Sequence, residues 1–170
     1  MYSLKIMYYS YLYKYFYTKE NNINKNIFIS GATRSGTTWL MEMLHTPNMQ
    51  IVWEATKYEN LLNTTSEKFT KELGIIPYIP VDCIWDEAYE YFDKLIHGNI
   101  VQEISKDSHP LLLSNPFNKD TNLIKLCNIN LLLPWLCKNF DIQPIVIIRN
   151  PFDVVLSQLN HIGYNHMGKV

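Results

Sequence analysis

The feature that most constrains this chain is a glycine-bounded loop between a strand and a helix. The apolar run Ile27–Ser30 predicts the strand, and Gly31 and Gly36 follow it with four residues between them. Two hydroxyl residues, Thr37 and Thr38, come directly after the second glycine. Successive backbone N–H groups in a loop of this spacing wrap a phosphate, and the N-terminus of the following helix adds partial positive charge. The order predicts an anion-binding turn at the start of an α/β domain.

The segment after the loop has the periodicity of an amphipathic helix. Its apolar residues recur at helical spacing and are Trp39, Leu40, Met43 and Leu44. Pro47 closes the pattern. We therefore expect a helix that begins at the loop and ends before this proline.

Strand and helix patterns alternate along the rest of the chain. Strands are predicted at 51–53, 100–104, 123–126 and 145–148, and helices at 86–97 and 129–140. The first of these helices carries four apolar or aromatic residues on one face, namely Tyr89, Phe92, Leu95 and Ile96. The run 145–148 is entirely aliphatic, which suits a strand covered on both faces in a parallel sheet. The alternation predicts an α/β fold, a three-layer sandwich around a central parallel sheet.

The loop differs from that of a nucleotide triphosphatase at one informative position. Thr37 stands where those enzymes carry the lysine that reaches the β and γ phosphates. The cation lies inside the loop instead, at Arg34. A loop with one arginine and two threonines suits a single phosphate and a neighbouring charged group better than a triphosphate. The plainer alternative is a glycine-rich turn with an exposed arginine.

A second motif surrounds Arg149, which follows the aliphatic run 145–148. Asn150 can serve as a helix N-cap, and Pro151 suits the first helical position. Ser157 lies about two turns along the same helix. Open α/β sheets bind ligands at the carboxyl ends of their strands, which is where Arg149 is expected. The alternative is an arginine that only ties down a helix end.

Together the two motifs resemble those of PAPS-dependent sulfotransferases, whose sulfate donor is 3'-phosphoadenosine 5'-phosphosulfate (PAPS). The segment Arg34–Trp39 resembles their 5'-phosphosulfate loop, and Arg149 with Ser157 resembles their strand-Arg-[DN]-Pro-helix-Ser motif for the 3'-phosphate. The tyrosylprotein and bacterial types are the most similar. The resemblance implies a fold related to the P-loop nucleotide kinases. It also implies a donor site formed by Arg34, Ser35, Gly36, Thr37, Thr38, Trp39, Arg149 and Ser157.

Sulfuryl transfer needs a base for the acceptor proton and a cation at the bridging oxygen, and the resemblance implies Arg34 as that cation. Two residues compete for the base. Glu54 follows a predicted strand and matches the acidic residue of tyrosylprotein-type members, whose pattern His45 and Pro47 also roughly fit. His109, in Lys-Asp-Ser-His-Pro, is similar to the Lys-Thr-His of cytosolic members. We favour Glu54 and retain His109; a solvated side chain is the plain alternative for both.

Two other sets of polar residues have weaker interpretations. Lys125 lies at the end of a predicted strand and resembles a lysine that precedes the 3'-phosphate strand in bacterial-type members, but an exposed strand-end lysine fits equally well. His97, His161 and His166 lack metal-ligand spacing, and no metal is expected.

Charge and composition exclude several classes of function. The chain has 170 residues, with 15 Lys+Arg against 16 Asp+Glu and a net charge of -1, which argues against nucleic-acid binding. Its three cysteines have no C-x-x-C spacing, so reduced thiols are expected rather than a disulfide framework or a zinc site. The sequence has no uninterrupted apolar run of about 18 residues, so it predicts no membrane-spanning helix. The cytoplasm is the expected compartment, or the Golgi if the chain is a fragment.

These observations leave three functional hypotheses. The leading one is sulfuryl transfer from PAPS to a hydroxyl or amine on a small molecule, peptide or glycan. A P-loop nucleotide or small-molecule kinase is the second, and it conflicts with Thr37. The third is a truncated, non-catalytic nucleotide-binding module, because only thirteen residues follow Ser157. In each case residues 1–25 are a Tyr- and Asn-rich extension and residues 26–170 form the domain.

Overall fold

The computed structural model describes residues 25–57, 61, 65–100, 109 and 119–160. Apart from Lys25, the expected N-terminal extension lies outside these residues. The expected strand 100–104 also lies outside them except for Ile100, which is buried and belongs to no strand.

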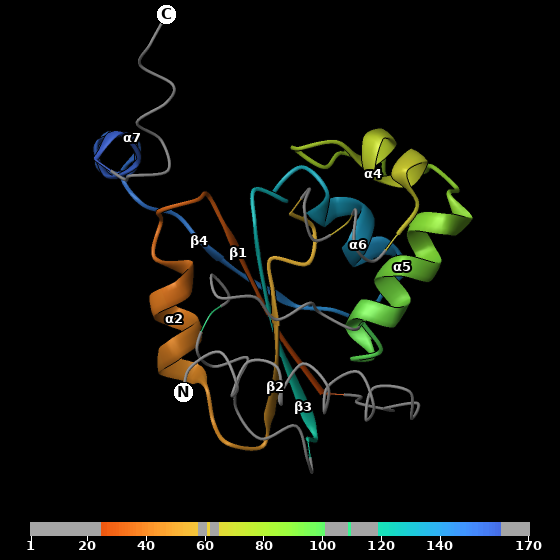
Figure 1. Ribbon diagram of the computed structural model, residues 1–170, viewed down its shortest axis with the longest axis horizontal. Helices are drawn as coiled ribbons and strands as arrows, with labels where there is room; N and C mark the ends of the chain where they lie inside the picture. The colour runs from red at the N-terminus through yellow and green to blue at the C-terminus, as the bar shows by residue number, and fades with distance from the viewer. Residues whose placement is uncertain (1–24, 58–60, 62–64, 101–108, 110–118, 161–170) are drawn as a thin grey trace, which may run out of the picture.

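Four parallel strands form the central sheet (Figure 1). In spatial order they are β2 (Met49–Trp53), β3 (Thr121–Cys127), β1 (Lys25–Gly31) and β4 (Pro144–Ile147). The register places Gly31, the last residue of β1, beside Cys127 of β3 and Ile147 of β4. The carboxyl ends of these three strands therefore meet at one edge of the sheet, where ligands bind in open α/β folds.

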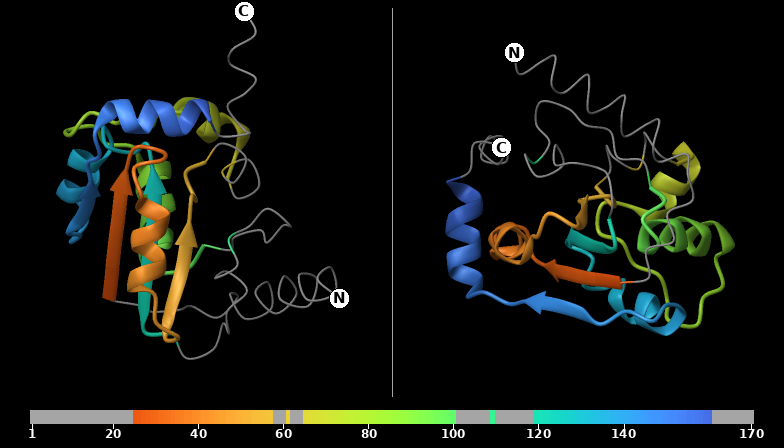
Figure 2. Two further views of the ribbon diagram at one scale, coloured as in Figure 1. Left: turned by 90° about the vertical axis from the view of Figure 1, so that its left-hand side faces the viewer. Right: turned by 90° about the horizontal axis from the view of Figure 1, so that it is seen from below.

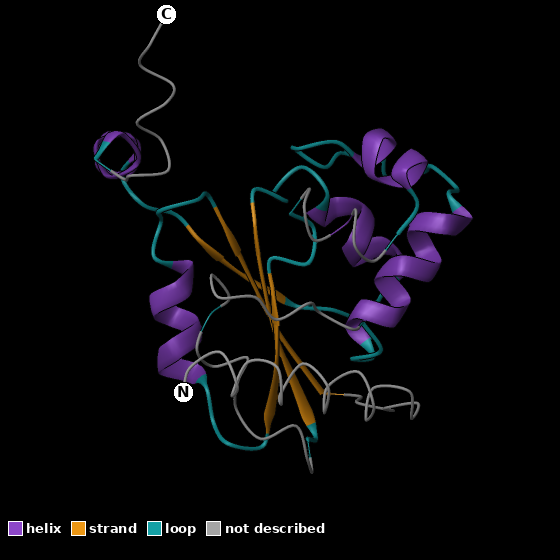
Figure 3. Ribbon diagram, in the orientation of Figure 1, coloured by secondary structure: helices purple, strands orange, loops and turns teal. Residues whose placement is uncertain are grey.

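Helices cover both faces of the sheet, which confirms the predicted three-layer architecture (Figure 3). On one face lies α2 (Thr37–Leu44); on the other lie α4 (Glu67–Leu73), α5 (Asp86–Ile96) and α6 (Leu133–Asn139). The last described helix, α7 (Pro151–Leu159), lies at the carboxyl edge of the sheet near the start of α2 (Figure 2). Two loops, between β1 and α2 and between β4 and α7, are thereby brought to the same edge.

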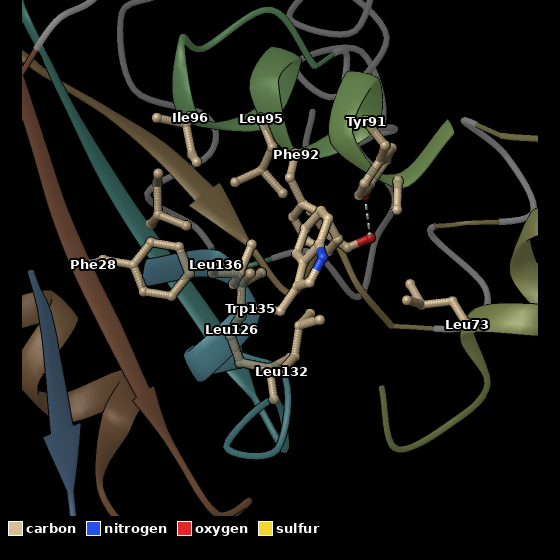
Figure 4. Close-up of a cluster of buried hydrophobic side chains, with 14 of the residues drawn as sticks. Phe28, Leu73, Tyr91, Phe92, Leu95, Ile96, Leu126, Leu132, Trp135 and Leu136 are labelled. Carbon is tan, nitrogen blue, oxygen red and sulfur yellow. Dashed lines mark hydrogen bonds between the residues drawn. The ribbon is translucent and has the colours of Figure 1, made fainter. Parts of the chain in front are cut away.

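The core divides into two clusters because successive strand residues point to opposite faces. Phe28 and Ile124 belong to the larger cluster, which they share with α4, α5 and α6 and in which Trp135 is buried (Figure 4). Their neighbours Ile29 and Leu123 belong to the smaller cluster beneath α2. The sheet is thus packed heavily on one face and lightly on the face that carries the glycine loop.

The structure corrects the expected packing faces of two helices. In α5 three of the four expected residues are buried, but Tyr89 is exposed and stacks on Phe140 with 4.9 Å between ring centroids. Tyr91 is buried instead and donates a hydrogen bond of 2.8 Å to the Ala55 carbonyl oxygen. Helical geometry explains the exchange, since residue 91, and not 89, shares a face with 88, 92 and 95.

In α2 the expected apolar pattern also contains exposed residues. Trp39 and Met43 are exposed, whereas Met41 is fully buried against the sheet. Leu40 and Leu44 are partly buried beside it. The helix itself begins and ends where expected, so the error concerns its orientation and not its existence.

The expectation that the aliphatic run after residue 144 is a strand covered on both faces is wrong. It does form β4, but β4 lies at an edge of the sheet, and Ile145 and Val146 are each 43% exposed. Ile148 is 91% exposed. Composition alone identified a strand here, but burial depends on neighbouring elements that composition does not specify.

One helix boundary differs from expectation, and one helix was not expected. The helix expected over 129–140 begins later, because a turn around Ile129 precedes it and Pro134, which has no backbone N–H, occupies its first turn. Helix α4 was not expected at all, although its signals are present in the sequence. Ser66 caps it by accepting from the Phe69 N–H at 3.0 Å, and Gly74 ends it.

Candidate functional site

Close packing at the end of β1 shapes the loop that the sequence singled out. A Cβ on Gly31 would lie 2.8 Å from the Ile147 carbonyl oxygen and 2.8 Å from Ser35 Oγ, so only glycine fits there. Arg34 and Gly36 have left-handed backbone conformations, with φ of 73° and 107°. The loop is therefore folded tightly back over the sheet edge before α2 begins.

At the start of α2 the helix has no side-chain cap, and one buried hydroxyl has no partner among the described residues. The N-cap is Gly36, which has no side chain to satisfy the first helical N–H groups, and those groups have no acceptors within the helix. Ser35 Oγ is buried and has no hydrogen-bond partner among the described residues. Unsatisfied donors of this kind, together with the helix dipole, favour an anion. The geometry fits a phosphate at this point.

The remaining loop residues have different surroundings. Thr37 is buried, and its hydroxyl lies 3.3 Å from the Cys127 sulfur, so in this structure it faces the sheet. Thr38 is half-buried in the first turn of α2, and Trp39 is exposed beside it. Burial, followed by the nearby Glu54 charge, raises the pKa of the Cys127 thiol to about 11, so the thiol stays protonated at neutral pH.

The second motif lies against this loop. Arg34 Nε donates to Ser157 Oγ at 3.1 Å, across 123 positions of sequence. Arg149 Nη1 lies 3.4 Å from the Arg34 carbonyl oxygen, and Gln158 Nε2 donates to the Thr33 carbonyl oxygen at 3.1 Å. The structure thus brings together Arg34, Arg149 and Ser157, three residues that the sequence assigned to two separate motifs.

Positive charge is concentrated at this edge. Arg34 and Arg149 are the only arginines in the whole sequence, and both are exposed here. Neither forms an ion pair with a carboxylate among the described residues. Two guanidinium groups beside an uncapped helix N-terminus are chemically suited to an anion with more than one charged group.

Glu54, the favoured base, is held at the end of β2 by the neighbouring strand β3. Its Oε1 forms an ion pair with Lys125 Nζ, and its Oε2 accepts a hydrogen bond of 2.9 Å from the Cys127 N–H. The backbone at Glu54 is left-handed, with φ of 52°. Lys125 is only 4% exposed and lies 5.6 Å from the centre of the Trp53 ring. Lys125 is therefore not an exposed strand-end lysine, and Glu54 is not a solvated glutamate; both of these interpretations are wrong.

His109, the other candidate base, contacts the Trp53 ring and helix α2. It is buried, its ring meets the Trp53 ring edge-on at 5.0 Å, and its Nε2 lies 2.9 Å from Glu42 Oε1. Glu42 stands one helical turn after Thr38 on α2. Glu54 is therefore connected to the loop through Cys127 and Thr37, whereas His109 lies beside Glu42 and near His45 at the end of α2.

A further histidine, His45, ends α2. Burial, with Lys119 and His109 nearby, lowers its pKa below the usual value of 6.5. Lys119 Nζ donates to the Pro47 carbonyl oxygen at 2.7 Å, and burial lowers the pKa of this lysine too. Among the residues that the structure describes, no three His, Cys, Asp or Glu side chains gather as metal ligands.

Sequence reasoning missed three polar residues that contact the site. Asn128 binds the loop at Thr33, Gln158 binds it from α7, and Glu42 binds His109. For Asn128 a signal was available, because it directly follows a strand whose carboxyl end was expected at the ligand edge. Nothing in the local sequence marks Gln158 or Glu42, since their partners lie far away in the chain.

The fold is an α/β sandwich in which a glycine loop and two arginines meet at the carboxyl edge of the sheet. The family model for the sulfotransferase domain matches residues 24–169. The chain therefore belongs to the sulfotransferase domain family and is a transferase of sulfuryl groups. No curated protein and no solved structure matches it significantly. Among the described residues, no helix is both long and apolar enough to cross a membrane.

Proposed function

We propose that this sulfotransferase uses PAPS as its donor and transfers the sulfuryl group to a hydroxyl or amine. The observation that carries the proposal is the convergence of Arg34, Arg149 and Ser157 on one uncapped helix N-terminus. A donor with phosphates at both the 5' and 3' positions needs two anion sites, and the two arginines supply one each. Planar guanidinium groups suit this task because they pair with two oxygens at once.

In this proposal the glycine loop holds the 5'-phosphosulfate and the start of α7 holds the 3'-phosphate. The amides of Gly36 to Thr38 and the buried Ser35 hydroxyl would bind the 5'-phosphate, with the Thr38 hydroxyl beside them; the Ser35 amide donates to the Ala32 carbonyl oxygen at 3.0 Å. Thr37 would contribute its amide, since its hydroxyl faces Cys127. Trp39 adds an exposed aromatic surface next to the loop.

PAPS supplies an activated S–O bond to its 5'-phosphate, and this bond breaks as the acceptor oxygen or nitrogen bonds to sulfur. The bond electrons pass to the phosphate oxygen, where Arg34 would stabilise the charge. The acceptor proton passes to a protein base. We propose Glu54 for this role, because its carboxylate contacts Cys127 and, through that residue, Thr37 of the loop. His109, hydrogen-bonded to Glu42, is the alternative base.

Titration with adenosine 3',5'-bisphosphate, the product of the donor, tests the proposal. We expect it to bind more tightly than ATP. Arg34→Ala and Arg149→Ala should each weaken this binding by about 10- to 100-fold, as expected for hydrogen bonds to charged groups. Lys94→Ala, which removes a lysine paired on α5, is the charge-matched control and should leave binding unchanged. Tighter ATP binding with phosphate transfer would instead support a kinase.

The choice of base is tested with labelled sulfate transfer across pH. Glu54→Gln should lower kcat by about 10²- to 10⁴-fold and leave the affinity for the bisphosphate nearly unchanged. His109→Asn should lower kcat far less. The reverse ranking would assign the base to His109. If both variants fold but neither transfers sulfate above background, both side chains are needed for transfer.

A further inference from the structure

The first residue after β3, Asn128, makes three hydrogen bonds to the glycine loop. Its backbone N–H donates to the Gly31 carbonyl oxygen at 3.0 Å. Its side-chain Oδ1 accepts from the Thr33 N–H at 3.1 Å, and its Nδ2 donates to Thr33 Oγ1 at 2.9 Å. We propose that Asn128 is a positioning residue that holds the loop in its anion-binding shape. The catalytic meaning of this role rests on the proposed function.

The backbone at this position explains why asparagine is suited to it. Asn128 has φ of 60°, a left-handed conformation that asparagine adopts more readily than most residues. The bend turns its side chain back over the loop. Glycine would tolerate this φ but has no amide, and aspartate has no N–H to donate to Thr33 Oγ1. Asparagine provides the conformation, a donor and an acceptor together.

The residue that Asn128 binds controls the direction of Arg34. The Thr33 peptide is held from two sides, because Asn128 accepts its N–H and Gln158 donates to its carbonyl oxygen. The next residue, Arg34, has a left-handed backbone that depends on its neighbours to persist. Arg34 then reaches Ser157 at 3.1 Å. Release of Thr33 would therefore allow Arg34 to leave the geometry in which it meets an anion.

The same turn also holds the favoured base. Cys127, the residue before Asn128, donates its N–H to Glu54 Oε2 at 2.9 Å. One dipeptide at the end of β3 therefore contacts both the donor loop and Glu54. Since β3 is an interior strand of the sheet, this turn sets the separation between the loop and the base.

Asn128→Gly tests the proposal, because it keeps the left-handed backbone and removes only the side chain. We expect adenosine 3',5'-bisphosphate to bind about 3- to 10-fold more weakly, as for the loss of one or two neutral hydrogen bonds. The KM for the donor should rise more than kcat falls. Thr33→Val should have a similar effect, and the double variant should be little worse than Asn128→Gly alone.

Asn130→Ala is the matched control in the same turn. Asn130 accepts from Ser30 Oγ at 3.2 Å and so contacts β1 and not the loop. Its loss should lower the Tm without changing the affinity for the bisphosphate. Equal affinity of Asn128→Gly and the wild type would overturn the proposal, as would an equal loss of affinity in Asn130→Ala.

Amide hydrogen exchange gives a readout that needs no donor. In Asn128→Gly the Thr33 amide should exchange about tenfold faster, because its acceptor is gone, while the Leu40 amide, bonded to the Gly36 carbonyl oxygen, should not change. Unchanged exchange at Thr33 would also overturn the proposal. If the wild type does not bind the bisphosphate but Thr33 is released as expected, the proposed function fails and the positioning role of Asn128 stands.

Discussion

The two arginines reach one site from parts of the molecule that are supported very differently. Arg34 belongs to the interior half, which we define by its buried contacts as β1, β2, β3, the glycine loop and α2, although β2 is itself an edge strand. There Ile29 is fully buried and Gly31 is in close contact on two sides. Arg149 belongs to the edge half, β4 and α7, where Ile148 is almost fully exposed. In the interior half we expect donor binding and folding to depend on the same contacts. In the edge half we expect them to be separable.

Loss of the lysine in the buried ion pair should have the largest effect on stability. Lys125→Met leaves the Glu54 carboxylate without its ion-pair partner in a largely buried position, and we expect the free energy of unfolding to fall by about 3–5 kcal/mol. Denaturant unfolding measures this. The double variant Lys125→Met/Glu54→Gln should recover most of the loss, because it also removes the carboxylate charge that Lys125 balances. If Lys125→Met alone were as stable as the wild type, the stability of the interior half would not depend on this buried ion pair.

Gly31→Ala should have the next largest effect. The added Cβ meets backbone and side-chain atoms at 2.8 Å, so the loop or β4 must shift, at a cost of about 1–3 kcal/mol. We expect the Tm and the affinity for adenosine 3',5'-bisphosphate to fall together. Gly36→Ala offers a comparison, since no atom lies within 4 Å of its Cβ and only its φ of 107° opposes the change. A loss of stability in Gly31→Ala with normal binding would separate the two properties.

A smaller effect on stability is expected from the protonation of His45 at the end of α2. Its pKa is lowered in the folded protein by burial, Lys119 and His109, the last of which also faces Glu42. The folded state thus favours neutral His45, and its contribution is present above about pH 6.5 and is lost as pH falls through the lowered value. His45→Gln should therefore lose less stability than the wild type between pH 7 and pH 5. If the free energies of unfolding of the variant and the wild type changed equally with pH, this prediction would be wrong.

Arg149→Ala should have the smallest effect on stability and still abolish much of the donor binding. The side chain is exposed and makes one long hydrogen bond to the loop, so the free energy of unfolding should change by less than about 0.5 kcal/mol. Thermal unfolding and bisphosphate titration on the same sample measure both quantities. A fall in Tm as large as that of Gly31→Ala would show that the edge half also supports the fold.

Local sequence was sufficient for much of the interior half. The spacing of Gly31 and Gly36, the strand before them and the helix after them predicted the loop, because each signal acts within a few residues. The strand from residue 145 and the cap at Asn150 were likewise readable. The orientation of the helices could not be predicted in the same way. Trp39 and Tyr89 are exposed, which shows that periodicity identifies a helix more reliably than the side that it buries.

The sequence by itself determined the glycine loop, the strand–helix alternation and the presence of only two arginines. The tertiary structure alone decided that Lys125 pairs with Glu54, that His109 pairs with Glu42, and that Asn128 holds Thr33. These partners lie 67 to 95 positions apart. The register of the parallel sheet and the packing of α2 bring them together, because backbone hydrogen bonds align strand ends whatever the length of chain between them.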